Sequence, residues 1–187
     1  DKDGDVVTAT ATVTVASNGT PTISITDNNG AVGGQVTVDE AALASGSNPS
    51  STAESAAGTM TVTAPNGLAS IDFGITNVTV AQLNALGSTP VAITMADGTM
   101  TLIGYNAGTG VISYTYAITT AQTAAGASVT DSLTLTVHDS TGLPANTVST
   151  NFTATILDDK PTAAADARSV TEDQVGITGN LVTGVNA

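Results

Sequence analysis

Carboxylates are the side chains of this chain whose type and spacing could do chemistry. Asp1, Asp3 and Asp5 alternate around Gly4, so several oxygens can converge on one ion at a glycine turn. Calcium is a hard cation that takes about six to eight oxygen ligands from carboxylates, carbonyls and water. The pattern matches only the front of an EF-hand loop, because Thr12 stands where that loop needs glutamate. We expect a calcium site of another kind; the alternative is a solvated acidic turn.

A second acidic pair, Asp158 and Asp159, precedes Pro161. Like charges repel, and proline lacks the N–H that a sheet ladder needs, so this stretch predicts a short junction between two folded units. A weaker copy of the junction precedes Pro21, with Asn18-Gly19 in place of the two aspartates. The two prolines are 140 positions apart (161 − 21), which predicts a tandem repeat of that length.

The acidic residues divide between these two junctions. We expect calcium to bind both, with a dissociation constant of about 10⁻⁴ to 10⁻³ M, as in extracellular modules. The ligands expected at the first junction are Asp1, Asp3 and Asp5, with one or more of Asp27, Asp39 and Glu40. Those expected at the second junction are Asp158, Asp159 and Asp139, with Glu172 or Asp173.

The other titratable residues do not predict an enzyme. His138 is the only histidine, the chain has no cysteine, and no Ser-His-Asp order or phosphate loop occurs, so neither a zinc site nor catalysis is expected. Asp72 lies in an alternating pattern and is expected at the solvent or at a sheet edge. Asp97 suits a tight turn, and Asp131 is expected on the surface of a strand.

Composition and periodicity predict that β-strands must position these residues. Hydrophobic residues make up 41% of the chain but aromatic residues only 3%, so β-branched and aliphatic side chains must build the core. Residues 1–15 show the clearest alternation, between threonine and valine or alanine. Further strands are expected near residues 23–25, 36–38, 60–64, 71–75, 91–95, 100–103, 111–118, 129–137 and 152–156.

Short helical turns and a loop complete the expected unit. Asp39 can cap a single helical turn, and Thr79 with Gln82 has capping-box spacing for a helix over residues 80–86. Residues 44–58 are expected to form a loop. The sum is an all-β, immunoglobulin-like β-sandwich with Greek-key character and one or two short helical turns.

The repeat length divides the chain into three parts. Residues 1–19 are expected to be the C-terminal strand and linker of a preceding repeat. Residues 20–160 are expected to be one complete domain, and residues 161–187 the N-terminal part of the following repeat. The two flanking pieces could pair with each other or with a neighbouring molecule.

A net charge of −13 bounds the possible partners. Nucleic acid and anionic membrane surfaces need lysine and arginine, of which the chain has three, so neither is an expected partner. No membrane-spanning run is present, and no small-molecule substrate is expected. Clustered carboxylates favour cations instead, and a metal can take the place of the disulfides that the chain lacks.

Taken in order, these stretches resemble a known family. The Asp1-Lys2-Asp3-Gly4-Asp5 stretch, the threonine-valine strand, Asp158-Asp159 before Pro161, and Thr171-Glu172-Asp173 resemble the extender repeats of giant RTX-type adhesins that Gram-negative bacteria export by type I secretion. The resemblance implies immunoglobulin-like domains strung end to end in a tandem array, with calcium at the junctions and a location at the bacterial cell surface. The chain departs from the family's pattern at Asn18-Gly19 and at 139–142, which both lack carboxylates of that pattern.

The expected function is therefore that of a calcium-stiffened spacer in cell adhesion and biofilm formation, with neighbouring repeats of the same chain as partners. One rival is a carbohydrate- or protein-binding module that would use loop 44–58 or the tyrosines Tyr105, Tyr114 and Tyr116. The scarcity of aromatic residues argues against it. A stalk or surface-layer protein without adhesive function is a second rival, and an enzyme or accessory domain a third.

Overall fold

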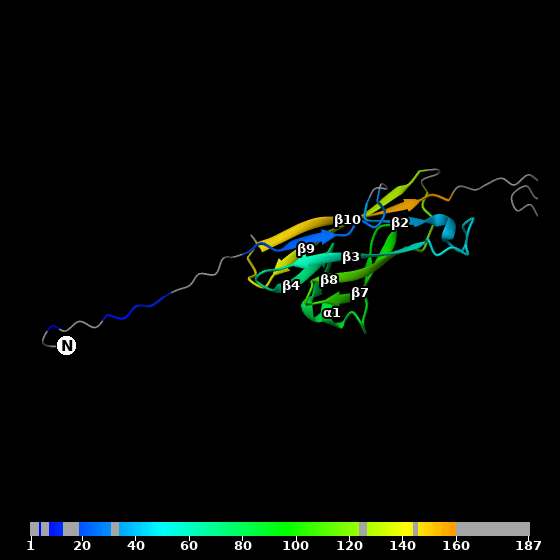
Figure 1. Cartoon of the computed structure of the whole chain (residues 1–187). Coiled ribbons are helices and arrows are strands. Elements are labelled where there is room, and N and C mark those ends of the chain that lie inside the picture. Colours follow the sequence, from blue (N-terminus) through cyan, green and yellow to red (C-terminus); the bar gives the residue numbers. More distant parts are fainter. Residues whose placement is uncertain are drawn as a thin grey trace, which may run out of the picture.

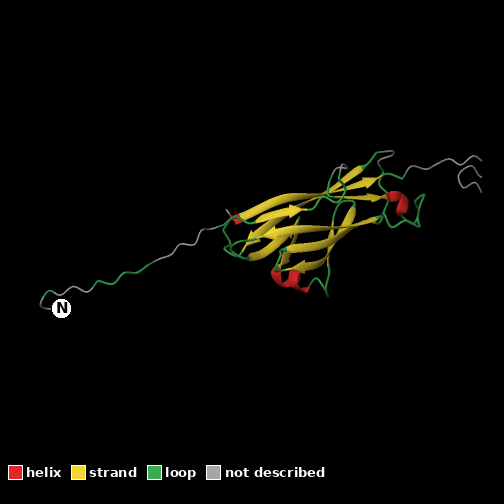
Figure 2. Ribbon diagram, viewed as in Figure 1, coloured by secondary structure: helices red, strands yellow, loops and turns green. Residues whose placement is uncertain are grey.

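The described strands form two facing sheets. The computed structural model describes residues 4, 8–12, 19–30, 34–123, 127–143 and 146–159. One five-stranded sheet, which we call sheet A, has the order β1 (Thr22–Ile25), β3 (Ser55–Thr63), β8 (Val111–Ile118), β7 (Gly98–Asn106), β6 (Val91–Thr94). The other, sheet B, has the order β2 (Val36–Asp39), β10 (Thr147–Leu157), β9 (Val129–Asp139), β4 (Leu68–Phe73), β5 (Thr76–Thr79). Figures 1 and 2 show the two layers.

The strand order is that of an immunoglobulin-type sandwich. The first edge segment is divided between the layers: β1 pairs with β3 in sheet A, and β2 then crosses to pair with β10 in sheet B. The chain changes sheets again between β2 and β3, β3 and β4, β5 and β6, and β8 and β9, which gives the Greek-key connections. Every neighbouring pair is antiparallel except β2 and β10, which are parallel. The all-β sandwich predicted from composition and alternation is confirmed.

The core lies between the sheets and is built on alternation. In β8 the side chains of Ile112, Tyr114 and Tyr116 point inward and are buried, while those between them face outward. Phe152 of β10 contacts both tyrosines, with ring centroids 5.4 Å and 5.8 Å away. Gly58 of β3 makes room for this cluster, because a Cβ there would collide with the Tyr114 hydroxyl. Three of the five described aromatic rings therefore concentrate in one place.

Two short helices form where the sequence predicts them. Asp39 caps η1 (Glu40–Ala42) by accepting from Ala41 N at 2.9 Å. Thr79 and Gln82 form the predicted capping box at the start of α1 (Val80–Ala85). Leu83 of α1 is buried, so the helix covers part of the core between β5 and β6.

Four sequence-based expectations need correction. Thr8–Thr12 form no strand, and they pair with no other described segment, which a strand requires. The predicted loop 44–58 ends early, because β3 begins at Ser55. The strand expected near residues 71–75 ends at Phe73, and Ile75 is fully exposed in the turn between β4 and β5. Asp131 is 1% exposed rather than on the surface.

Candidate functional site at the acidic end

Most of the described carboxylates lie at one end of the sandwich. β2, β9 and β10 place their residues 39, 129 and 157 at this end, and β3, β7 and β8 place residues 55, 98 and 118 there. Strand pairing therefore brings together acidic residues from five separate parts of the chain. We call this the acidic end; its carboxylates are Asp39, Glu40, Glu54, Asp97, Asp131, Asp158 and Asp159. They are seven of the ten acidic residues described.

The C-terminal strand ends in this cluster. Leu157 of β10 is paired with Asp39 of β2, so Asp158 and Asp159 continue directly beyond the sheet. The Asp159 carboxylate accepts from Ser47 N at 2.8 Å and from Ser47 Oγ at 2.5 Å. These two hydrogen bonds tie the chain to the loop after η1 where it leaves the sandwich. Both aspartates remain partly exposed and can reach a ligand from solvent.

Two further carboxylates of the acidic end come from the segment around η1. The Asp39 side chain is already used as the helix cap. Glu40 is 3% exposed, and its Oε1 accepts from Gln122 N at 2.7 Å, which joins η1 to the segment after β8. The sequence placed Asp39 and Glu40 at the first junction, which is wrong: the parallel pairing of β2 with β10 puts both at the end where the chain leaves.

Two buried carboxylate oxygens of the acidic end have no hydrogen-bond partner among the described residues: Glu54 Oε2 and Asp131 Oδ1. Asp131 Oδ2, by contrast, accepts from the Tyr116 hydroxyl at 2.8 Å and from Asp97 N at 3.1 Å. Burial and the neighbouring Asp131 carboxylate both raise the pKa of Tyr116, which stays protonated and donates. A buried oxygen without a donor is costly unless a cation, a proton or water satisfies it.

The opposite end of the sandwich is organised by hydrogen bonds around Asp139. Its carboxylate accepts from Asn66 Nδ2 and Asn146 Nδ2, each at 2.9 Å, and from Thr141 N at 3.0 Å. Burial raises the pKa of Asp139, but these donors outweigh it and hold the pKa below its usual range. Asn66 also donates to Gly19 O, where the chain enters the sandwich. N–H groups of the protein thus stabilise the charged Asp139 carboxylate, so it needs no bound cation for this purpose.

The predicted grouping of Asp139 with Asp158 and Asp159 is wrong. Along β9 and β10, His138 is opposite Thr147 and Val129 is opposite Ile156, so Asp139 lies about one strand length from Leu157. Asp27 belongs to neither end. It lies in the crossover between β1 and β2, and its Oδ1 accepts from Asn29 N and Gly30 N, both at 3.0 Å.

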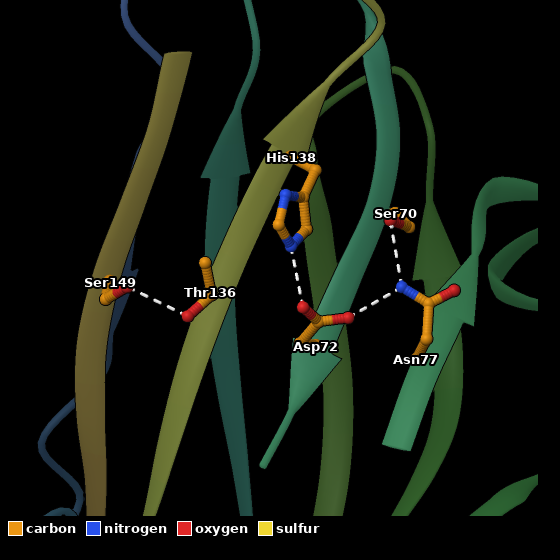
Figure 3. Close-up of polar contacts among 6 residues, drawn as sticks. All are labelled: Ser70, Asp72, Asn77, Thr136, His138 and Ser149. Carbon is orange, nitrogen blue, oxygen red and sulfur yellow. Dashed lines mark hydrogen bonds and ion pairs between the residues drawn. The ribbon is translucent and has the colours of Figure 1, made fainter. Parts of the chain in front are cut away.

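The outer face of sheet B carries a second polar cluster (Figure 3). His138 Nε2 lies 2.6 Å from Asp72 Oδ2, and Asn77 Nδ2 donates to Asp72 Oδ1 at 2.6 Å and to Ser70 Oγ at 3.0 Å. The Asn77 hydrogen bond, followed by the His138 contact, lowers the pKa of Asp72. The expected position of Asp72 on a solvent-facing surface is confirmed. The array is partly exposed and links the neighbouring strands β4, β5 and β9. His138 also lines a hollow of about 340 Å³ with Leu143 and Asn146.

The remaining expected ligands lie outside the described residues: Asp1, Asp3, Asp5, Glu172 and Asp173. Among the residues that the structure does describe, no three His, Cys, Asp or Glu side chains are grouped closely enough to hold a metal ion by themselves. The donor chemistry of the acidic end nevertheless fits a hard cation, since it consists of carboxylate oxygens of which two are buried and unpartnered. An ion there would need added ligands from backbone carbonyls, water or the following segment.

Sequence patterns alone missed Glu54, Asp97 and Asp131 as members of the acidic end. Glu54 and Asp97 directly precede β3 and β7, and Asp131 is the third residue of β9. Their shared location could be found only by first assigning the strand order, because the three residues are far apart in the sequence. Asp131 was also misplaced: it alternates in phase with the buried Leu135 and Val137, so the pattern points inward, and only its charge suggested the surface.

Two of the three tyrosines proposed for a carbohydrate- or protein-binding module cannot contact a ligand. Tyr114 and Tyr116 are fully buried, and burial raises the pKa of Tyr114 to about 12. Tyr105 remains partly exposed and lines a hollow of about 350 Å³ with Leu68 and Gly108.

Comparisons with protein-family models, with curated proteins and with solved structures give no match for this chain. None of the described helices is long and apolar enough to cross a membrane.

Proposed function

We propose that this chain is a calcium-stiffened spacer domain of an extracellular bacterial adhesin, in which the acidic end binds calcium and fixes the position of the following repeat. The single observation that carries the proposal is the collection of seven carboxylates at the end where the chain leaves the sandwich. Charges of one sign gathered in one place destabilise the compact state unless a counter-ion neutralises them.

The residues have distinct parts in this proposal. Asp158 and Asp159, which are partly exposed and next to the exit, would be first to meet the ion. Glu54 would offer its unpartnered buried oxygen, and Glu40 holds η1 to the segment after β8 by accepting from Gln122 N. Calcium supplies positive charge and a flexible oxygen coordination shell, which the following segment could complete. The opposite end needs no ion, because Asp139 already has protein donors.

Calcium-dependent unfolding tests the proposal. At about 10 mM calcium and a dissociation constant of about 10⁻⁴ to 10⁻³ M, binding should stabilise the fold by about 1.4–2.7 kcal/mol. That corresponds to a rise in Tm of roughly 3–10 °C relative to chelator for a domain of this size. The double variant Asp158→Asn/Asp159→Asn should lose most of the rise.

A charge-matched control separates the acidic end from general charge effects. Asp27→Asn/Asp72→Asn removes two carboxylates located elsewhere and should keep the calcium response. Equal Tm values in calcium and chelator for the unmodified chain, or an equal loss in both double variants, would refute the proposal.

A further inference from the structure

One almost completely buried carboxylate lacks a partner for one of its oxygens. Among the described residues, three carboxylates are buried: Glu40 at 3%, Asp131 at 1% and Asp139 at 2% exposure. Each oxygen of Asp139 accepts two hydrogen bonds. Asp131 Oδ2 likewise accepts from the Tyr116 hydroxyl and from Asp97 N, but the buried Asp131 Oδ1 accepts none within the described part of the chain. The fold therefore supplies donors for every oxygen of Asp139 and leaves one oxygen of Asp131 open.

A second carboxylate lies beside the same hydroxyl. Asp97 is in the turn between β6 and β7, and after burial and Asp131 its charge also contributes to the raised pKa of Tyr116. The Asp97 carboxylate is therefore close to the hydroxyl that Asp131 accepts from. Gly98 permits this approach of the turn, because a Cβ there would be 2.5 Å from the Tyr116 hydroxyl oxygen. Two carboxylates, one from a turn of sheet A and one from a strand of sheet B, thus meet at one buried hydroxyl.

A divalent cation suits this arrangement better than a proton or a water molecule. A proton on Asp131 Oδ1 would turn that oxygen into a donor, which itself needs an acceptor. Water would supply a hydrogen bond but leave the charges of Asp97 and Asp131 close together where solvent screens them poorly. An ion of charge +2 neutralises both carboxylates, and a donor set of oxygens without nitrogen or sulfur is typical of hard cations.

We propose that Asp131 and Asp97 form an internal calcium site, separate from Asp158 and Asp159 at the exit of the chain, in which one ion joins the β6–β7 turn to β9. Solvent reaches it past Asp97, which is partly exposed, and along the first part of β9, because β4 pairs with β9 only as far as Leu135. Two carboxylates fill only part of a shell of about six to eight oxygens, so water and backbone carbonyls would complete it. The choice of calcium rests on the proposed function, whereas the position of the site rests on Asp131 and Asp97.

Terbium luminescence tests this site, because terbium replaces calcium and emits light when a tyrosine close to it is excited. The chain has no tryptophan, so only tyrosine can sensitise the ion, and Tyr116 is the tyrosine bonded to Asp131. The unmodified chain should give terbium emission that added calcium abolishes by competition. Tyr116→Phe should remove most of this emission. Tyr105→Phe, at the opposite end of the sandwich, should keep it.

Charge variants identify the ligands in the same assay. Asp97→Asn removes a carboxylate but keeps the backbone N–H that Asp131 accepts from, so the variant should still fold. It should weaken terbium binding at least about tenfold, because affinity depends on the number of charged ligands. Asp72→Asn removes a partly exposed carboxylate from the outer face of sheet B and should leave the binding unchanged. Equal binding by the two variants, or an unmodified chain without tyrosine-sensitised emission, would overturn the proposal and leave water or a proton at Asp131 Oδ1.

The variant Asp158→Asn/Asp159→Asn separates the internal site from the proposed spacer function. It should keep the tyrosine-sensitised emission, and with it the smaller remaining part of the calcium-dependent rise in Tm. Emission that is lost in this variant but kept in Asp97→Asn would overturn the internal site while supporting calcium binding at the exit. Emission and the full rise in Tm kept in this variant, with both lost in Asp97→Asn, would support the internal site and refute the exit as the place where calcium acts.

Discussion

At the residue scale, the central interaction is the one between Asp131 of sheet B and Tyr116 of sheet A. It crosses the core, joins the two layers by a hydrogen bond of 2.8 Å, and also holds Asp97 N at the turn before β7. A carboxylate in this position is expensive to bury, so its donors matter more than those of a surface group. It sets the distance between the sheets next to the acidic end.

Truncating this carboxylate should therefore destabilise the fold. Asp131→Ala leaves the Tyr116 hydroxyl and Asp97 N without their acceptor, and we expect a loss of about 2–4 kcal/mol in the free energy of unfolding. Ser132→Ala, on the outward face of the same strand, should change it by less than about 0.5 kcal/mol. Urea titration measures both, and similar small losses would contradict the bridging role.

Asp72 predicts a dependence on pH. Because the Asn77 hydrogen bond and then the His138 contact lower its folded pKa, the folded state favours the ionised carboxylate. The resulting stability is complete above the ordinary value of 3.8 and disappears as the pH falls through the lower folded value. The group is partly exposed, so the effect should stay below about 1 kcal/mol.

Asp72→Asn should remove this contribution, so the stability difference from the unmodified chain should shrink as the pH is lowered from 7 towards 2. Asn77→Ala removes the main donor and should reproduce part of the change. Urea midpoints measured across this pH range check it. Parallel pH profiles for Asp72→Asn and the unmodified chain would show that the interaction contributes nothing.

At the element scale, β2 determines what the acidic end contains. The strand lies parallel to β10, and Gln35 fixes its start by accepting from Thr153 N through Oε1 at 2.6 Å and donating its own N to Thr153 O at 2.7 Å. Gly34, just before it, has φ of +81° and lies so close to β10 that a Cβ would be 2.5 Å from Thr153 O. This close approach brings Asp39 and Glu40 to the exit of the chain.

Two glycines of the same crossover give a matched comparison. Gly30 and Gly34 both have positive φ, but a Cβ at Gly30 meets nothing within 4 Å. Gly30→Ala should cost only the backbone strain, about 1 kcal/mol, whereas Gly34→Ala should cost about 1–2 kcal/mol more because the strand must also move. Thermal unfolding of the two variants measures the difference, and equal costs would mean that β2 is not held against β10 in this way.

The sequence predicts elements well where local patterns suffice. Alternation located β8 and the hairpin around Asp97, and capping chemistry located η1 and α1 to within a residue or two. The candidate site was less predictable, since strand order decides which residues meet. Asp139 ends β9 and Asp158 directly follows β10, and these two strands are neighbours in sheet B. Because the two strands are antiparallel, their C-terminal residues lie at opposite ends of the sandwich.

At the scale of the whole molecule, charge is distributed along one axis. Seven carboxylates lie at the acidic end, whereas at the opposite end the Asp139 carboxylate is hydrogen-bonded by protein donors. The strands of sheet A, which run between the two ends, carry no charged residue. The described part of the sandwich behaves as a unit with one strongly negative end, which suits attachment in series through a cation.

Monovalent salt should partly replace calcium at this scale. The Debye length falls from about 10 Å at 0.1 M to about 3 Å at 1 M, so sodium chloride should screen the acidic end and raise Tm in chelator. The rise should be smaller in calcium and in the variant Glu54→Gln/Asp97→Asn/Asp159→Asn. Calorimetry measures it, and an equal salt response in that variant would show that the cluster is not the source of the repulsion.

The parallel pairing of β2 with β10 has a consequence for a chain pulled from both sides. Thr22 is opposite Thr63 at the end of β3, whereas Leu157 is opposite Asp39 beside the start of β3, so the two residues lie at opposite ends of the sandwich. Tension therefore draws the start of β2 one way and the end of β10 the other. The two strands are then loaded in shear, and the four register pairs from Val36–Ala154 to Asp39–Leu157 must yield together rather than unzip one at a time. The two hydrogen bonds from Ser47 to Asp159 lie closer to the C-terminal point of loading than these four pairs, so they bear the tension first.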